Sequence, residues 1–258
     1  MGKLNELFKA WPSGTVVVQP WLAERQIVRQ LANKYVTGGW VTKIGSGTYI
    51  KAGDQVNWQG GVYALQQQLN QKVHVGGLTA LELLGKAHFI PLGNNHTLYI
   101  YTHGRSPNRS LPKWLTEYFK TNKFSYVPRA LFSTKLGLHD LASGNFTIAC
   151  STPERALLEA LVLVPKKLSF EHAYLLMEGQ ETLRVDLLQS LLQNCRSYLL
   201  KRLFLHLAKK CQLPWFERLN LNSIELGQGK RKIGSGAYYD PEFKLLVPVV
   251  KEVEDPLI

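Results

Sequence analysis

The sequence predicts an α+β fold, with a small N-terminal domain over residues 1–92 and a larger mixed α/β domain over residues 93–258. Three observations lead to this prediction. Short helical segments and a glycine-rich hairpin fill the first fifty residues, and strand-like segments alternate with helices after residue 97. The composition, 45% hydrophobic and 19% charged, also supplies enough apolar side chains for a packed core.

The N-terminal segment is expected to contain two short helices and a third, longer one. Residues 4–11 form the first helix, which ends at Pro12-Ser13-Gly14, and residues 20–25 form the second, with Pro20 in its first turn. The third helix begins near residue 28, where apolar residues recur with helical spacing. Its apolar face comprises Val28, Leu31, Ala32 and Tyr35. Its polar face comprises Arg29, Gln30, Asn33 and Lys34.

A β-hairpin is expected next, in the sequence TGGWVTKIGSGTYIKAGD, because apolar residues on both arms flank glycines that can adopt the positive φ of a turn. Three helices followed by a hairpin form the plan of a winged helix-turn-helix, in which the third helix enters the major groove of DNA. Arg, Gln, Asn and Lys suit base edges and phosphates, and the hairpin, or wing, contacts the sugar-phosphate backbone. The sequence therefore predicts DNA contacts by the polar face of the third helix and by the wing residues Lys43, Ser46 and Lys51.

The remaining elements follow from periodicity and capping residues. Helices are expected over residues 62–69 and from Thr79 onward, and a strand over residues 97–103. The segment STPERALLE is expected to start a helix over residues 151–164, with Glu154 in a capping box and Glu159 on the solvent face. Residues 185–211 are expected to be helical with one break near residues 194–197, before β structure returns at the C-terminus.

The charge of the chain indicates a polyanionic partner. The net charge is +12 and the pI is about 9.6, and such an excess favours nucleic acid or an acidic surface. The cations are clustered, since residues 196–232 contain nine basic side chains and two acidic ones. We therefore expect a second basic surface in the C-terminal part, made of Arg196, Lys201, Arg202, Lys209, Lys210, Lys230, Arg231 and Lys232.

Several other classes of protein do not fit the sequence. The longest apolar run, residues 160–165, is too short for a membrane span, and three widely spaced cysteines favour the reducing cytoplasm over a disulfide framework. His96 and His103 match no zinc pattern, and no phosphate-loop, serine-hydrolase or paired-carboxylate motif is present. We expect no catalytic residue, metal or cofactor, and hence no enzyme.

One short sequence occurs twice, as KIGSGTYI over residues 43–50 and KIGSGAYY over residues 232–239. A phosphate-binding loop of this kind leads into a helix, whereas strand-like residues follow both copies, and the flanking sequences do not repeat. We therefore interpret the two copies as exposed basic hairpin turns.

Several segments together resemble the AbiEi antitoxin family of bacterial type IV toxin-antitoxin and abortive-infection systems, which defend against phage. They are WLAERQI, LANKYVTGGWVTKIGSGTYIKAGDQVNWQGGVYALQQQL, VHVGGLTALELLG and HFIPLG, followed by LPKWL, STPERALLE and LLVP. The resemblance implies a winged helix-turn-helix repressor that binds inverted repeats in double-stranded promoter DNA of its own operon, as a monomer in solution that binds cooperatively on DNA. It also implies a second domain needed for antitoxicity, and a nucleotidyltransferase-like toxin that forms no stable complex with the antitoxin. This chain departs from the family at the helix-turn-helix turn, where Gln26-Ile27 stands in place of the frequent glycine.

Two alternatives remain open on sequence alone. The basic charge also suits an RNA-binding or RNA-processing factor, which turnover of RNA by the purified protein would identify. It equally suits an interaction protein that binds an acidic toxin directly, which co-purification would identify.

Overall fold

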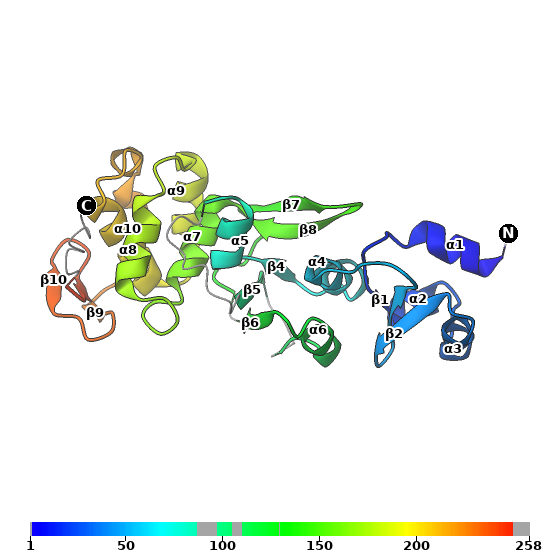
Figure 1. The fold of residues 1–258 in the computed structure, drawn as a ribbon. Coiled ribbons are helices and arrows are strands. Elements are labelled where there is room, and N and C mark those ends of the chain that lie inside the picture. The colour runs from blue at the N-terminus through cyan, green and yellow to red at the C-terminus, as the bar shows by residue number, and fades with distance from the viewer. Residues whose placement is uncertain (1, 87–96, 105–109, 129, 250–258) are drawn as a thin grey trace, which may run out of the picture. The chain divides into compact units, whose positions relative to one another are not determined.

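The computed structural model describes residues 2–86, 97–104, 110–128 and 130–249 (Figure 1). Helices and sheets both occur, which confirms the predicted α+β class. The chain forms two compact units, each built from three segments. The N-terminal unit comprises residues 1–75, 93–130 and 138–150, and the C-terminal unit comprises residues 76–92, 131–137 and 151–258. The expected division into two contiguous domains, 1–92 and 93–258, differs from this division into segments and stays a prediction.

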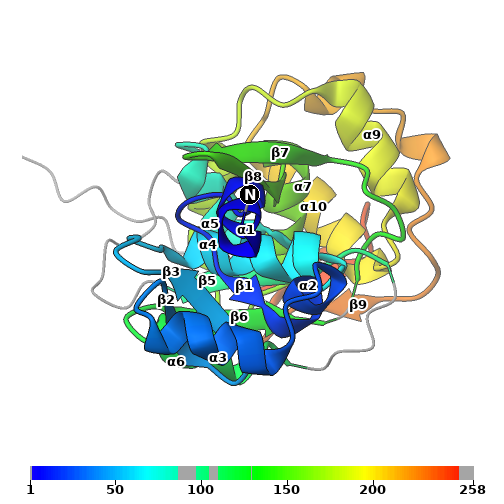
Figure 2. The ribbon, with the colours of Figure 1, turned by 90° about the vertical axis from the view of Figure 1, so that its right-hand side faces the viewer.

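The N-terminal unit begins as a winged helix-turn-helix, as predicted. Its elements are α1 (Lys3–Ala10), β1 (Val17–Val18), α2 (Gln19–Glu24), α3 (Arg29–Thr37), β2 (Val41–Gly45) and β3 (Thr48–Lys51). The strands form an antiparallel sheet in the order β1-β3-β2, and Figure 2 shows α2 and α3 beside it. The tertiary pairing of β1 with β3 therefore closes the small domain around one apolar core that contains Trp11, Leu22 and Ile27.

The turn between α2 and α3 is tight although it contains no glycine. Gln26 itself adopts the left-handed conformation, with φ of 58°, and Ile27 is buried behind it with 1% exposure. The amide of Ile27 donates to the carbonyl of Leu22 at 2.9 Å, which closes the turn. The turn is thus tight, at the cost of a backbone conformation that a residue with a Cβ rarely adopts.

A five-stranded sheet completes the N-terminal unit. Its strands are β4 (Val73–Val75), β5 (Thr97–Thr102), β6 (Lys123–Val127), β7 (Leu138–Ser143) and β8 (Phe146–Ser151), in the order β6-β5-β4-β8-β7. The neighbouring helices are α4 (Trp58–Tyr63), the π-helical turn η1 (Ala64–Gln68) and α6 (Lys113–Tyr118). Strand β4 pairs antiparallel with β5 and parallel with β8, so the sheet is mixed. The predicted strand at residues 97–103 is confirmed, and the helix expected at 62–69 begins earlier and continues as η1.

Two glycines in α4 allow close packing in this unit. A Cβ on Gly60 would lie 2.1 Å from the carbonyl oxygen of Gly14, and a Cβ on Gly61 would lie 2.4 Å from Leu115 in α6. The backbone of α4 therefore approaches both the helix-turn-helix segment and α6 at distances that only glycine permits.

The C-terminal unit is mainly helical. Its helices are α5 (Gly77–Leu83), α7 (Pro153–Leu161), α8 (Phe170–Glu178), α9 (Val185–Asn194), α10 (Tyr198–Lys210), η2 (Phe216–Arg218) and η3 (Leu221–Ser223). Helix α7 packs against α5, α8, α9 and α10, and all its residues after Pro153 are buried. The predicted break in the long helical segment is confirmed, because α9 ends at Asn194 and α10 starts at Tyr198. Helix α5 begins two residues before Thr79, which had been expected to cap it.

The buried α7 corrects two expectations about STPERALLE. Glu159 lies in the core rather than on the solvent face: its carboxylate accepts from the Ser151 hydroxyl at 2.7 Å and from the Gly77 amide at 3.2 Å. Arg155 donates to the same carboxylate at 2.8 Å. Glu154 forms no capping box, because its carboxylate binds the backbone amide and guanidinium of Arg184, each at 3.0 Å. The polar residues of this motif thus hold α5, α7 and the start of α9 together.

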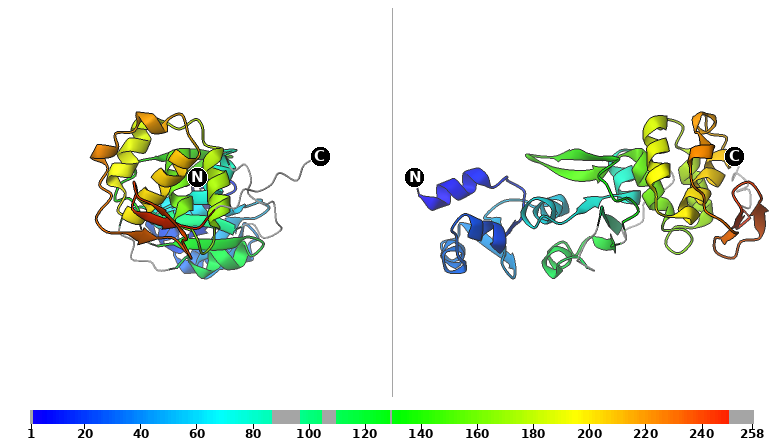
Figure 3. Two further views of the ribbon diagram at one scale, coloured as in Figure 1. Left: turned by 90° about the vertical axis from the view of Figure 1, so that its left-hand side faces the viewer. Right: turned by 180° about the vertical axis from the view of Figure 1, so that it is seen from behind.

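A small sheet ends the described chain, drawn in orange to red in Figure 3. It comprises β9 (Arg231–Lys232), β10 (Tyr238–Asp240) and β11 (Leu245–Val247), in the order β10-β11-β9. Because β9 pairs parallel with β11 and does not pair with β10, the second KIGSG copy is a crossing loop and not the hairpin that was expected. The two copies also differ locally: Gly47 has positive φ in the first, and Gly234 in the second.

Candidate nucleic-acid interface

The polar face of α3 is fully presented to solvent. Arg29, Gln30, Asn33 and Lys34 are all exposed, whereas Ala32 is buried against the domain. Residues four positions apart share a helix face, so Arg29 lies beside Asn33 and Gln30 beside Lys34. The structure therefore brings the four predicted residues of the third helix together on one surface.

Val28 differs from its expected place. It was assigned to the buried face of the third helix, but it is the N-cap residue of α3 and its side chain is 58% exposed. Helical spacing placed it on the apolar face, and this argument fails because the residue stands outside the helix with an extended backbone, at φ of −69° and ψ of 162°. No side-chain hydrogen bond caps this helix end. The sequence analysis missed Val28 as a surface residue. The one available signal was its place directly before the polar Arg29, at the start of the helix.

The wing presents two of its three predicted residues. Lys43 and Ser46 are exposed, in the middle of β2 and in the turn that follows the strand. Lys51 is half-buried and faces α1: its ammonium donates to the carbonyl of Phe8 at 3.2 Å and lies 5.9 Å from the centre of the Trp11 ring. Lys51 therefore stabilises the end of α1 and does not join the surface made by Lys43 and Ser46.

The wing also rests on α6, which the sequence did not suggest. A Cβ on Gly45 would lie 2.8 Å from the Cβ of Trp114, so the absence of a side chain at Gly45 permits this contact. The neighbouring Lys113 is exposed and adds a cation near the wing. The segment LPKWL thus supports the wing from another part of the N-terminal unit.

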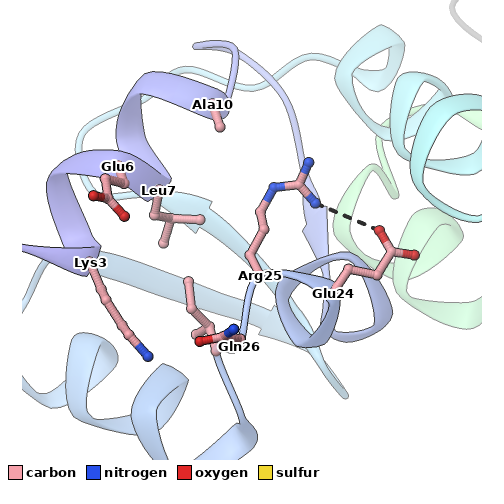
Figure 4. A pocket seen from close by; sticks show the side chains of 8 residues that line it. Lys3, Glu6, Leu7, Ala10, Glu24, Arg25 and Gln26 are labelled. Carbon is pink, nitrogen blue, oxygen red and sulfur yellow. Dashed lines mark ion pairs between the residues drawn. The ribbon is translucent and has the colours of Figure 1, made fainter.

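A pocket of about 390 Å³ lies between α1 and the helix-turn-helix turn (Figure 4). Lys3, Glu6, Leu7, Ala10, Glu24, Arg25, Gln26 and Ile27 line it. The Arg25 guanidinium pairs with Glu24 at 3.7 Å, and its centre lies 3.6 Å from that of the Trp21 ring. The lining is mixed, with two carboxylates and two cations beside apolar side chains.

The second basic surface is only partly present, and α10 is the reason. Arg202 has 1% exposure, and its guanidinium donates to the carbonyls of Leu226, Gly227, Gly229 and Lys244 at 2.6–3.2 Å. Lys201 has 2% exposure, and burial lowers its pKa. The expectation that Lys201 and Arg202 form a surface is therefore wrong.

Other polar residues of α10 hold the same C-terminal sheet. His206 Nδ1 lies 2.6 Å from the carboxylate of Asp240, and Lys209 pairs with Glu242. Because positions 202, 206 and 209 share one helix face, these polar side chains bind the loop and sheet over residues 226–244. The predicted surface residues that remain exposed are Arg196, Lys209, Lys210, Lys230, Arg231 and Lys232.

The described residues contain no cluster of three potential metal ligands, and none of their helices is both long and apolar enough to cross a membrane. His103 lies beside His74, with 3.4 Å between their Nδ1 atoms, and His96 lies outside the described residues. Burial raises the pKa of Cys195, and that of Cys211 to about 12, so both thiols stay protonated and unreactive at neutral pH.

Two family models match the chain. Residues 1–92 match the model described as "Transcriptional regulator, AbiEi antitoxin N-terminal domain". Residues 96–248 match the one described as "Transcriptional regulator, AbiEi antitoxin, Type IV TA system". The chain matches no curated protein. Among solved structures, the RV2827C protein from Mycobacterium tuberculosis is similar in fold, with a TM-score of 0.59 and 15% identity over 95% of this chain and 89% of that chain.

Proposed function

The chain belongs to the AbiEi family of antitoxin transcriptional regulators of type IV toxin-antitoxin systems, and from this we propose that it represses its own operon by binding promoter DNA. The observation that carries the proposal is the exposed polar face of α3 beside an exposed wing. Arg29, Gln30 and Asn33 contact base edges in the major groove, while Lys34 and Lys43 bind phosphates.

Val28 supports the same proposal. A valine at an N-cap costs helix stability relative to serine or threonine, and exposing it to water gains nothing. Its position at the helix end that enters the groove suits contact with the 5-methyl group of thymine. The exposed N-cap valine therefore supports a role for this helix end in recognition.

A gel-shift assay with the DNA upstream of the chain's own gene tests the proposal. The logarithm of the affinity should fall linearly with the logarithm of the salt concentration. Arg29→Ala should relax sequence preference, with a loss of about 1–3 kcal/mol at one base pair, whereas Lys43→Gln should weaken all sequences alike and lower the salt slope by about 1. Lys135→Gln, at an exposed lysine outside both predicted basic surfaces, is the matched control. Failure to bind this DNA at low salt would disprove the proposal.

We further propose that the chain counteracts a nucleotidyltransferase-like toxin in the cytoplasm without catalysis and without a stable complex. Cys195, Arg155 and Glu159 are all buried, and the last two form an ion pair. Because none of these three groups faces solvent, their burial supports the absence of catalysis. Co-expression of the toxin and the tagged chain tests the second part. Growth rescue without co-purification is expected. Co-purification of the toxin would instead support direct neutralisation, and turnover of labelled RNA would contradict the non-enzymatic role.

A further inference from the structure

The pocket beside the helix-turn-helix turn has two walls and an apolar floor (Figure 4). One wall is α1, whose lining residues Lys3, Glu6, Leu7 and Ala10 follow the i, i+3, i+4, i+7 spacing of one helix face. The other wall is the turn that follows α2. Leu7 and Ile27, one from each wall, are buried, with 3% and 1% exposure, and supply the floor. The volume of about 390 Å³ lies at the lower end of the range for small-molecule sites.

Arg25, on the turn wall, is preorganised to bind a carboxylate. Its guanidinium lies 3.6 Å from the centre of the Trp21 ring, and its Nη1 donates to the Trp21 carbonyl at 3.1 Å. The carboxylate of Glu24 lies 3.7 Å away, which is beyond hydrogen-bond distance. The other N–H donors of the guanidinium therefore have no acceptor among the described residues. Because stacking already fixes this side chain, it loses little conformational freedom when it binds an anion.

The α1 wall supplies the opposite charge. Glu6 lines the pocket and forms no ion pair with any described residue, so its carboxylate is available to an ammonium group. The two carboxylates and two cations of the lining balance each other, which disfavours a ligand with a net charge. A ligand that carries one charge of each sign beside an apolar body matches the walls and the floor together. An α-amino acid with an apolar side chain has this chemistry.

The turn that forms the pocket is linked to the wing through Gln19. The side-chain amide of Gln19 donates to the Ile27 carbonyl at 2.9 Å, and its backbone amide donates to the Gly47 carbonyl at 2.7 Å. One residue therefore connects the floor of the pocket with the wing turn. Ile27 also directly precedes Val28, the N-cap residue of α3. Because the left-handed Gln26 carries a conformational cost, a ligand that packs against this turn stabilises it.

From this arrangement we propose that the pocket binds an α-amino acid with an apolar side chain, and that the bound ligand strengthens promoter binding. The ligand carboxylate binds Arg25, its ammonium binds Glu6, and its side chain packs on Leu7 and Ile27. The pocket is formed while α3 and the wing are presented to solvent, so a ligand that binds this state increases its population. Ligand binding itself is independent of DNA, whereas the effect on the promoter rests on the proposed function.

Isothermal titration calorimetry of the full-length chain tests the site in the absence of DNA. The probes are L-leucine, L-methionine and L-phenylalanine, which share both charges and differ in the apolar side chain. Two analogues isolate the charges of leucine: isocaproate lacks the ammonium, and isoamylamine lacks the carboxylate. Each should bind more weakly than leucine by roughly 10- to 150-fold, because each loses the hydrogen bonds of one charged group.

Substitutions in the pocket locate the binding. Arg25→Gln and Glu6→Gln each remove one charged partner and should weaken amino-acid binding by roughly 10- to 150-fold. Ala10→Met places a larger side chain in the pocket and should abolish binding. Arg218→Gln and Glu117→Gln make the same changes at exposed positions outside the pocket, so these matched controls should bind as the parent does. Circular dichroism verifies folding of each variant.

The promoter gel-shift with and without saturating amino acid tests the effect on DNA binding. The ligand should raise promoter affinity by roughly 5- to 150-fold, the usual size of coupling between two sites. Gln19→Ala removes the link between the Ile27 carbonyl and the wing, although Gln19 does not line the pocket. This variant should therefore keep amino-acid binding and lose the increase in promoter affinity.

Two results would overturn the site: no binding of any of the three amino acids, or binding that Arg25→Gln, Glu6→Gln and Ala10→Met leave unchanged. Equal affinity for leucine and its singly charged analogues would contradict recognition of both charges. A promoter affinity that saturating ligand does not raise would overturn the effect on DNA binding. Failure of the gel-shift with and without ligand would contradict the proposed function instead, and calorimetry would still decide the site.

Discussion

Replacing Arg202 by lysine tests whether this arginine stabilises the fold or binds nucleic acid. The substitution keeps the positive charge of α10 but replaces a planar guanidinium by a shorter-reaching ammonium. The guanidinium satisfies four backbone carbonyls, those of Leu226, Gly227, Gly229 and Lys244. If lysine reaches two of them, the other two are left without a donor, at about 1–3 kcal/mol each. We therefore expect Arg202→Lys to lower the free energy of unfolding of the C-terminal unit by about 2–6 kcal/mol.

Equilibrium urea unfolding measures this loss, and hydrogen exchange locates it. The Ile233 amide donates to the Leu246 carbonyl at 2.8 Å, so its exchange should accelerate in Arg202→Lys. Arg231→Lys makes the same chemical change at an exposed position and should stay within about 0.5 kcal/mol of the parent. If Arg202→Lys proved as stable as Arg231→Lys, while nucleic-acid binding fell, the guanidinium would be a binding group and the structural argument would be refuted.

Three further predictions concern the other unusual residues. Gln26→Gly should raise the free energy of unfolding by about 1 kcal/mol, and with it the melting temperature, because glycine adopts the φ of 58° without strain. An unchanged or lower melting temperature would contradict this. Val28→Ser should stabilise α3 by about 1 kcal/mol through a new N-cap and should abolish discrimination between thymine and deoxyuridine in the gel-shift; retained discrimination would remove Val28 from the base contacts. Burial alone raises the pKa of Glu154, but the hydrogen bonds from Arg184 lower it to about 2. Because the folded pKa lies below the unfolded value of 4.5, the pair contributes stability above that pH and loses it as the pH falls towards 2. Glu154→Gln should therefore flatten the pH dependence of unfolding between about pH 5 and 2, by at most about 3 kcal/mol before solvent screening; an unaltered dependence would show that another carboxylate causes it.

Much of the N-terminal domain could be predicted because its signals are local. The breaker Pro12-Ser13-Gly14, the proline at the start of α2 and the glycine-rich wing turn each act within a few residues. The polar face of α3 followed from a helical period alone. Val28 was misplaced because a periodic pattern does not show where the helix begins, and one residue of error at a helix end changes a buried position into an exposed one.

The C-terminal basic residues show the limit of local reasoning. Lys201 and Arg202 belong to a charge cluster in the sequence, and such clusters are usually solvated. Arg202 is held by the carbonyls of residues 226, 227, 229 and 244, which follow more than twenty positions later. In the same way, the burial of Glu159 depends on Gly77 from a distant segment.

The sequence by itself determined the α+β class, the winged helix-turn-helix plan, the polar face of α3 and the basic character of the chain, since helical period, turn residues and charge are local properties. Only the tertiary structure decided which cations are free. Lys43 and Lys230 stay exposed, whereas Lys51 binds the end of α1 and Arg202 holds a distant loop. The two KIGSG copies illustrate the reason: identical residues form a hairpin turn in one place and a crossing loop in the other, because the strand that pairs beside them, and not their own sequence, fixes their conformation.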